Sequence, residues 1–391
     1  MSITANPATP ALTSRLPSVG TTVFTHMSTL AAQHGAVNLG QGFPDFPCDE
    51  RLVDAVTAAM RAGFNQYPMM TGVPALRQAI AAKITATYGH EYNADTEITV
   101  TAGATQALTT AILCCVHPGD EVIIIEPAYD SYEPTVELAG GVPVLVQMTL
   151  SEAGYTVPWQ KIAAAVTPKT RLLVINTPHN PTGAVLRQAD IDALTSIVQG
   201  TDILILADEV YEHMVYDGAR HESMSRHALL AARSFVVSSF GKTFHVTGWK
   251  IGYVAAPASL MTEFRKVHQY NVFSTNAPMQ HGIAAYMADP RPWQELPDFY
   301  QRKRDLFRAG LAASRFELLP ADGTYFQCVR YRGISDLPEV AFAEWLTAEF
   351  KVAAIPVAPF YRGGVESGVV RFCFAKQDDT LRLALDRLAR V

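Results

Sequence analysis

FVVSSFGKTFHVTGWKIGYVAA (residues 235–256) is the stretch that decides the fold, and it also carries the chain's most unusual side chain. It opens with an apolar run at 235–239 and closes with another at 253–256, both typical of strands buried on both faces. Lys242 follows the first run directly. Lysine is rarely buried without a partner, and burial lowers its pKa, which makes it an amine able to form Schiff bases. A surface lysine is the alternative that this position alone leaves open.

Similar apolar runs occur upstream and alternate with helical patterns. This alternation predicts an α/β fold: a mainly parallel seven-stranded sheet, sandwiched by helices and joined by right-handed crossovers. The other five strands are expected at 98–101, 121–125, 143–147, 171–176 and 203–207, with helices at 104–116, 158–166 and 189–199.

Beyond residue 258 the pattern changes to that of a smaller α+β domain. Helices are expected at 259–270, 277–287, 299–312 and from 378, and strands at 326–329, 352–355 and 369–374. A chain of 391 residues exceeds what one hydrophobic core usually serves. We therefore predict a large domain over 46–288 and a small domain over 289–391. The N-terminal segment 1–45 is expected to be part of the small domain.

Composition and charge argue against several classes of function. The net charge is −6 and no basic run occurs, so neither a nucleic-acid nor an anionic-membrane partner is expected. No apolar stretch reaches the ~18 residues of a membrane span, and no signal peptide is visible, which predicts a cytoplasmic protein. Five cysteines without a C-x-x-C pair argue against a disulfide framework or a structural zinc site, and we expect no metal.

Polar residues follow several predicted strands, at the sheet edge where ligands bind in open α/β folds. TAGATQ (101–106) places a small-residue turn at a helix N-terminus, which suits a phosphate, although a tight turn needs glycine anyway. TPHNPTG (177–183) is a turn cluster, and its local chemistry alone favours a plain turn over a loop that aims Asn180.

Two further charged residues lie next to apolar runs. Asp208 ends one of them, and a buried carboxylate needs a partner such as a protonated pyridine nitrogen, although a helix N-cap explains it equally well. Arg371 lies inside VRFCF (370–374), where its planar fork suits a carboxylate, and an internal ion pair is the alternative. Together, a Schiff-base lysine, a pyridinium partner, a phosphate cup and a carboxylate anchor make the set that pyridoxal phosphate (PLP) requires.

Segments along nearly the whole chain resemble the class I, fold-type I aminotransferases, particularly the branch of methionine and kynurenine/glutamine transaminases. The matching segments are NLGQGFPDF (38–46), NQYPMMTGVPALR (65–77), TAGATQAL (101–108), EPAYDSYEP (126–134), NTPHNPTG (176–183), DEVYEH (208–213), SSFGKTFHVTGWKIGY (238–253), DGTYF (322–326) and VRFCFAK (370–376). The lysine segment is the most specific of these. The resemblance implies a PLP-dependent aminotransferase.

The resemblance also implies roles for residues. Lys242 carries the cofactor as a Schiff base, Asp208 pairs with the pyridine nitrogen, and Asn180 and Tyr211 bind the ring hydroxyl. Tyr129 stacks on the ring. The phosphate is held by Ala104, Thr105, Ser239 and Lys250. Gly241 stands where aspartate-type members carry another phosphate-binding serine, so that contact is lost or replaced.

The remaining roles concern the partner subunit and the substrate. Tyr67 is expected to reach the phosphate of a neighbouring subunit, which implies a homodimer with shared sites. Arg371 is expected to grip the substrate carboxylate, with help from Asn180 and the backbone near Gly42.

Aromatic residues near the expected site indicate a roomy pocket for uncharged side chains. They are Phe24, Phe43, Tyr67, Tyr129, Phe273 and Tyr325, of which about half are expected to be core packing. Methionine is the first choice of donor, because a thioether packs well on aromatic rings. Phenylalanine, tyrosine, histidine, glutamine and kynurenine follow.

Two alternatives belong to other reaction or function classes. A β-lyase acting on cysteine conjugates or cystathionine uses the same scaffold, and it would release pyruvate and ammonia without an acceptor oxo acid. A non-catalytic PLP-binding regulator would add a DNA-binding helix-turn-helix, and the roughly forty residues before GQGFPDF show no such pattern.

Overall fold

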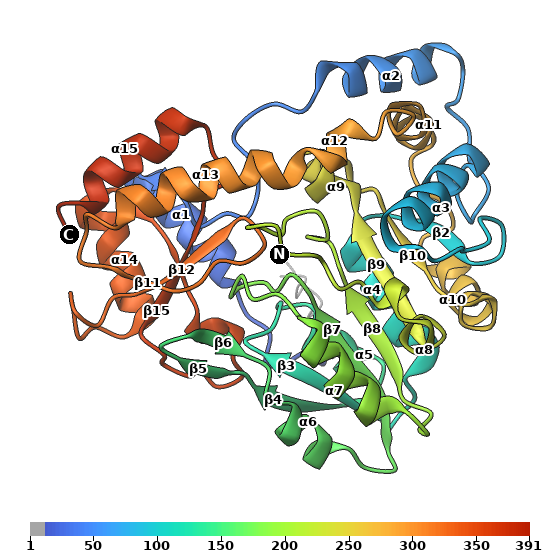
Figure 1. Cartoon of the computed structure of the whole chain (residues 1–391), viewed down its shortest axis with the longest axis horizontal. Coiled ribbons are helices and arrows are strands. Elements are labelled where there is room, and N and C mark those ends of the chain that lie inside the picture. The colour runs from blue at the N-terminus through green and yellow to red at the C-terminus, as the bar shows by residue number, and fades with distance from the viewer. Residues whose placement is uncertain (1–11) are drawn as a thin grey trace, which may run out of the picture.

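The computed structural model of the protein describes residues 12–391. At its centre a seven-stranded sheet has the strand order β2, β10, β9, β8, β7, β3, β4 (Figure 1). Only β10 is antiparallel to its neighbours, and the other pairs are parallel. The strands are β2 (Ile98–Thr101), β3 (Glu121–Glu126), β4 (Val142–Gln147), β7 (Thr170–Asn176), β8 (Leu204–Asp208), β9 (Ser234–Ser239) and β10 (Gly252–Ala255).

Alternate side chains of these strands enter two separate hydrophobic cores. In β7, Leu173 and Ile175 face one core while Leu172 and Val174 face the other, and all four are buried. Because successive side chains point to opposite faces and both faces are covered, each strand is a continuous apolar run. Because β3, β4, β7, β8 and β9 are parallel, the residues that follow their carboxyl ends lie at the same edge of the sheet.

Helices cover both faces of this sheet. Helices α4, α5 and α10 pack on one face and α6 and α7 on the other, while α3 and α11 cover the side of β2 and β10, with α2 against α11. Their bounds are α2 (Glu50–Arg61), α3 (Pro74–Tyr88), α4 (Ala104–Cys115), α5 (Tyr132–Leu138), α6 (Trp159–Ala165), α7 (Gln188–Val198), α10 (Ala258–Asn271) and α11 (Ala277–Tyr286). Short helices α8 (Ala228–Ala231), α9 (Phe240–Thr243) and α12 (Arg291–Gln294) and the hairpin β5 (Thr149–Ser151) and β6 (Gly154–Thr156) connect these elements.

The C-terminal part forms a second, antiparallel sheet with the strand order β11, β12, β15, β14, seen at the left of Figure 1. Helices α13, α14 and α15 pack on it, and α1 packs on α14. Strand β1 pairs in parallel with β13, so the segment that carries β1 lies in this part. The bounds are α1 (Val23–His34), β1 (Val37–Asn38), α13 (Leu296–Leu311), β11 (Glu317–Leu318), β12 (Phe326–Arg330), α14 (Glu339–Phe350), β13 (Val352–Ala353), β14 (Ile355–Pro356), β15 (Val369–Cys373) and α15 (Asp378–Leu388).

The predicted fold class is confirmed, with one strand corrected. The single strand expected at 352–355 is two short ones, because β13 pairs with β1 whereas β14 pairs with β15. The domain limits at 45/46 and 288/289 stay a prediction, and residues 1–11 of the expected N-terminal segment lie outside the described residues. Across residues 12–391, no helix is long and apolar enough to span a membrane.

Candidate active site

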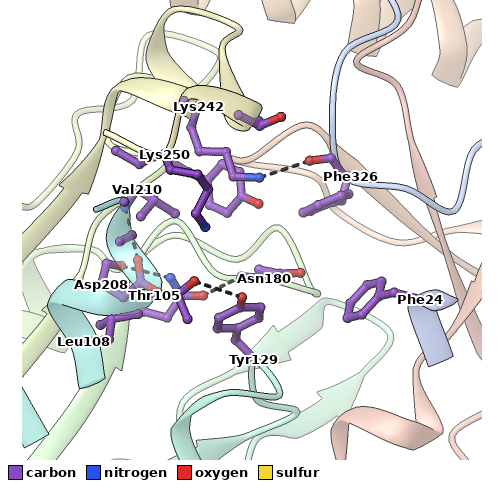
Figure 2. A pocket seen from close by; sticks show the side chains of 18 of the residues that line it. Phe24, Thr105, Leu108, Tyr129, Asn180, Asp208, Val210, Lys242, Lys250 and Phe326 are labelled. Atoms are coloured by element: carbon purple, nitrogen blue, oxygen red, sulfur yellow. Dashed lines mark hydrogen bonds between the residues drawn. The ribbon is translucent and has the colours of Figure 1, made fainter. Parts of the chain in front are cut away.

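A cavity of about 280 Å³ opens at the carboxyl ends of the parallel strands, where side chains from the second sheet and from α1 close it. Figure 2 shows Lys242 and Lys250 on one side of this cavity, Tyr129 and Asn180 opposite them, and Phe24 at the far end. The lining residues are Phe24, Gln41, Gly42, Gly103, Ala104, Thr105, Leu108, Tyr129, Asn176, Asn180, Asp208, Val210, Tyr211, Ser239, Gly241, Lys242, Thr247, Lys250, Ile251, Phe326 and Arg371.

One end of the cavity suits an anion. Gly103, with φ of 79°, turns the chain from β2 into α4, so Ala104 and Thr105 occupy the first turn of the helix. First-turn N–H groups have no helical carbonyl partner, and the helix dipole is positive there. A Cβ added at Gly103 would lie 3.5 Å from the Lys250 amine, which places this cation at the same helix end. Helix dipole and lysine together make a phosphate-binding end.

A buried carboxylate lies at the end of β8. Asp208 is 4% exposed, accepts a hydrogen bond from the Tyr132 hydroxyl at 2.6 Å, and accepts another from the Val210 N–H at 3.3 Å. Burial raises the pKa of Asp208 to about 6, although the Tyr132 hydroxyl, the Val210 N–H and the charge of Lys242 oppose the rise. The carboxyl therefore lies in surroundings that favour a cationic partner.

The amine of Lys242 faces the same cavity. It donates to the Gly42 carbonyl at 3.0 Å, the dashed line at its amine in Figure 2, and to the Tyr325 hydroxyl at 2.8 Å. Burial lowers the pKa of Lys242 to about 8. With this pKa, roughly a tenth of the amine is neutral at pH 7 and about half at pH 8, and the neutral form is the one that acts as a nucleophile or proton acceptor.

Arg371 is a buried cation that lines the same cavity. It is 1% exposed, and its guanidinium donates to the Asn180 side-chain oxygen at 2.6 Å and to the Gly40 carbonyl at 3.1 Å. The Phe326 ring lies 3.8 Å from it, with Phe24 and Phe360 farther out. Its buried Nε has no hydrogen-bond partner, so the guanidinium retains binding capacity for a carboxylate.

The cavity brings together most residues that the sequence singled out. Those lining it are Phe24, Gly42, Ala104, Thr105, Tyr129, Asn180, Asp208, Tyr211, Ser239, Lys242, Lys250 and Arg371. Four others do not line it, namely Phe43, Tyr67, Phe273 and Tyr325. Tyr67 is 83% exposed and packs edge-on against Phe273 at 5.4 Å between ring centres, whereas Tyr325 is fully buried beside Lys242.

Sequence reasoning missed several functional neighbours. Asn176 ends β7, donates to the Asp208 carbonyl at 2.9 Å and accepts from the Asn180 N–H at 2.7 Å. Its place at the end of a predicted strand was a usable signal. Tyr132 gave no signal, because it lies in a short helix 76 residues from the carboxylate that it contacts.

These residues fit the cofactor that the resemblance implies. PLP has an anionic phosphate, a ring nitrogen that can carry a proton, and an aldehyde that reacts with an amine. The cavity offers Lys250 with the start of α4 for the phosphate and the buried Asp208 for the ring nitrogen. It offers Lys242 for the aldehyde.

Comparisons with known proteins agree with this chemistry. The family model described as aminotransferase class I and II matches residues 35–388. Methionine aminotransferase of Escherichia coli (strain K12) is 47% identical and covers 100% of both chains. A probable N-succinyldiaminopimelate aminotransferase of Mycobacterium tuberculosis (strain ATCC 25618 / H37Rv) is 40% identical and covers 96% of this chain and 97% of its own.

One solved structure is similar over almost the whole length. The crystal structure of YbdL from Escherichia coli, described as having a methionine aminotransferase function, superposes with a TM-score of 0.96 at 47% identity. The match covers 98% of this chain and 100% of that one.

Proposed function

The chain belongs to the class I and II aminotransferases, and from this premise we propose that it transfers the α-amino group of methionine to a 2-oxo acid. The enzyme depends on PLP, whose aldehyde takes up the amino group and whose ring accepts the electrons left when the α-proton departs. The observation that supports methionine as the substrate is the full-length similarity to methionine aminotransferase. The donor leaves as its 2-oxo acid before the acceptor binds, which makes the reaction ping-pong.

Lys242 is the proposed base. Lys242 would hold the cofactor through its aldehyde, and its neutral amine, when free, would take the proton from the substrate Cα and release it again. The pKa of about 8 supports this role, because the amine then gains and loses a proton near neutral pH. Positioned proton transfer of this kind contributes ~10²–10⁴-fold in rate.

Three other groups hold the cofactor in this proposal. Asp208 keeps the ring nitrogen protonated, and its burial supports this because an unpaired buried carboxylate is costly. Tyr211 and Asn180, both at the cavity wall, bind the ring hydroxyl, and Tyr129 stacks on the ring. Lys250, Ser239 and the start of α4 hold the phosphate.

Arg371 is proposed to bind the substrate carboxylate, with Asn180 fixing its orientation. The substrate side chain then lies among Phe24, Tyr129 and Phe326, which line the cavity. A thioether sulfur gains ~0.3–1.5 kcal/mol per aromatic contact, which favours methionine. Phenylalanine, tyrosine, histidine, glutamine and kynurenine are proposed as weaker donors, because such pockets discriminate only about 10–200-fold per methylene group.

The proposed working unit is a homodimer with shared sites. Tyr67, Met69 and Tyr270 are large side chains exposed by 83%, 59% and 91%. They lie on neighbouring segments, because Tyr67 packs against Phe273 and His268 contacts the Met70 carbonyl. Such a group of exposed apolar side chains is typical of a protein interface. A second subunit covering it would bring Tyr67 toward the partner's phosphate site.

A donor screen tests the substrate choice. The holoenzyme is assayed with methionine, phenylalanine, kynurenine, aspartate and N-succinyl-diaminopimelate, each with 2-oxoglutarate and with 2-oxo-4-methylthiobutyrate as acceptor, reporting kcat/KM. Methionine is expected to exceed aspartate by at least about tenfold, because the aromatic walls offer no partner for a second carboxylate. Lys242→Ala is the control and is expected to abolish turnover and the absorption band of the bound cofactor.

Two results would contradict the proposal. A strong preference for aspartate or for N-succinyl-diaminopimelate would replace methionine as the donor. Pyruvate and ammonia formed from a cysteine conjugate without an acceptor oxo acid, at rates above transamination, would make the enzyme a β-lyase.

A further inference from the structure

Tyr325 contacts the reacting amine from behind the cavity. It is fully buried and does not line the cavity, yet its hydroxyl lies 2.8 Å from the Lys242 amine. The same hydroxyl donates its single proton to the Gly42 carbonyl. Because a phenol has one proton to give, its oxygen acts as an acceptor toward Lys242. The chain thus places two acceptors, the Tyr325 oxygen and the Gly42 carbonyl, at one amine.

Packing holds this hydroxyl in place. The Tyr325 ring lies edge-on to Tyr211 at 5.2 Å and to Phe326 at 4.9 Å, and it is tilted against Tyr300 at 5.6 Å, between ring centres. Its backbone carbonyl accepts from the Phe374 N–H at 2.9 Å. A buried ring enclosed on several sides does not change rotamer without displacing its neighbours. The hydroxyl is therefore a fixed point rather than an adaptable contact.

Two fixed acceptors determine how a neutral amine is oriented. A neutral amine has two N–H groups and one lone pair. When one N–H points to Tyr325 and the other to Gly42, the lone pair takes a tetrahedral position that faces neither acceptor. That position is where the nitrogen takes up a proton. Free rotation about the end of the lysine side chain would otherwise spread the lone pair over several directions.

We propose that Tyr325 is a positioning residue for Lys242: with the Gly42 carbonyl, it holds the amine released from the cofactor so that its lone pair faces the substrate Cα. This inference rests on the proposed transamination for its place in the reaction. The sequence suggested that Tyr325 contacts the substrate. This inference assigns it instead to the Lys242 amine, which it contacts from outside the cavity.

Removing the hydroxyl has a defined effect on the amine's protonation. The ionisable groups that influence Lys242 are Asp208, Arg371, Lys250 and Cys373, and the Tyr211 ring also faces the amine. Burial raises the pKa of Tyr325 well above its usual value, so the hydroxyl stays neutral and acts only through its hydrogen bond. Acceptors stabilise an ammonium more than a neutral amine. Loss of one acceptor therefore lowers the pKa of Lys242.

Tyr325→Phe tests the proposal, with Tyr300→Phe as the matched control. Tyr300 is equally buried and packs on Tyr325, but its hydroxyl has no hydrogen-bond partner. In the holoenzyme, single-turnover kinetics with methionine are expected to show the limiting rate of Tyr325→Phe falling by about ten- to a hundredfold. The half-saturating methionine concentration is expected to stay within about twofold, because Arg371 is untouched.

A second measurement does not depend on turnover. In the cofactor-free full-length chain, the rate at which the Lys242 amine recombines with PLP is followed against pH. The pH midpoint of Tyr325→Phe is expected to fall by about one pH unit, a tenfold change in the protonation equilibrium. Tyr300→Phe is expected to match the wild type in both measurements.

The two measurements separate this proposal from the proposed function. If methionine is not a donor but the midpoint falls only in Tyr325→Phe, the contact with Lys242 stands and the substrate assignment fails. An unchanged midpoint in Tyr325→Phe would overturn the positioning role. So would an equal loss of rate in Tyr300→Phe, because the effect would then come from ring packing.

Discussion

Asp208 is buried, which disfavours its charge, although its proposed role at the ring nitrogen requires that charge. Burial raises its pKa to about 6, against about 3.8 for an ordinary aspartate. The folded chain thus binds more protons at this group than the unfolded chain between these two pH values, and stability falls as pH rises through that range. Above pH 6 the penalty is complete, at up to about 3 kcal/mol. A cationic ring nitrogen next to the carboxylate offsets it.

Asp208→Asn is expected to separate activity from stability. Asparagine keeps the shape and an oxygen that can accept from Tyr132, but it removes the charge that is proposed to hold the ring nitrogen protonated. We expect kcat/KM to fall by about 10²–10⁴-fold, while the cofactor-free chain melts at an equal or higher temperature at pH 7.5. Enzyme assays and thermal melts of both forms measure the two effects. Tyr132→Phe, which keeps the charge, is the control, and a mild rate loss in Asp208→Asn would mean that another group protonates the ring.

At the scale of elements, one carboxylate ties several of them together beneath the site. Glu212 follows β8, one residue after Tyr211, and is 2.6 Å from the Lys83 amine of α3. It also accepts from the hydroxyls of Tyr88 in α3, Ser238 in β9 and Tyr253 in β10. Burial alone would raise the pKa of Glu212, but the charge of Lys83 and the hydrogen bonds from Lys83 and Ser238 hold it below its usual range. The ionised group joins the segment after β8, which carries Tyr211, to the end of β9, which carries Ser239.

Lys83→Met is expected to destabilise the chain strongly, because it leaves Glu212 buried and unpaired. The expected loss is about 3–5 kcal/mol, measured by urea unfolding of the cofactor-free chain at pH 7.5. The double variant Lys83→Met with Glu212→Gln removes both charges and is expected to recover part of the lost stability. Removing both charges of a buried ion pair destabilises a protein less than leaving one buried charge without its partner. Equal destabilisation in the single and double variants would show that packing, not charge, links α3 to the strands.

The strand ends could be predicted because each follows an apolar run that is unmistakable in the sequence. Lys242 and Asp208 were singled out in this way, whereas Asn180 gained its role from the family resemblance, and the structure places all three at one cavity. The Tyr325 contact with Lys242 could not be predicted, because it joins residues 83 positions apart, one in α9 and the other just before β12. Helices α2 and α14 were also missed, although Asp49 caps α2 through its side chain. The break between β13 and β14 depends on strand partners, which local sequence does not identify.

At the scale of the whole molecule, the cavity brings together most of the residues proposed to hold the cofactor, but Tyr67 does not line it. That side chain points to solvent within a group of exposed aromatic residues, beside a surface depression of about 520 Å³ formed by residues 65–68 and 274–278. An isologous dimer would bury the same surface on both subunits. Each subunit would then supply a tyrosine to the other, so neither site would work without its partner.

Mixing one weakened and one inactive variant tests whether the sites are shared. Tyr67→Ala is expected to lose at least about tenfold in kcat/KM, because it removes a phosphate contact, and Lys242→Ala is expected to lose all turnover. In a hybrid dimer, one site combines an intact Lys242 with an intact Tyr67 from the partner, while the other site carries both changes. Random mixing at equal amounts makes half of the dimers hybrid, so activity should recover to about a quarter of the wild-type value. Subunits are mixed after mild denaturation and refolding, sedimentation confirms dimers, and each variant refolded alone is the control. If Tyr67 served the site of its own subunit, each site in a hybrid would lack one of the two residues and the mixture would stay no more active than its parents.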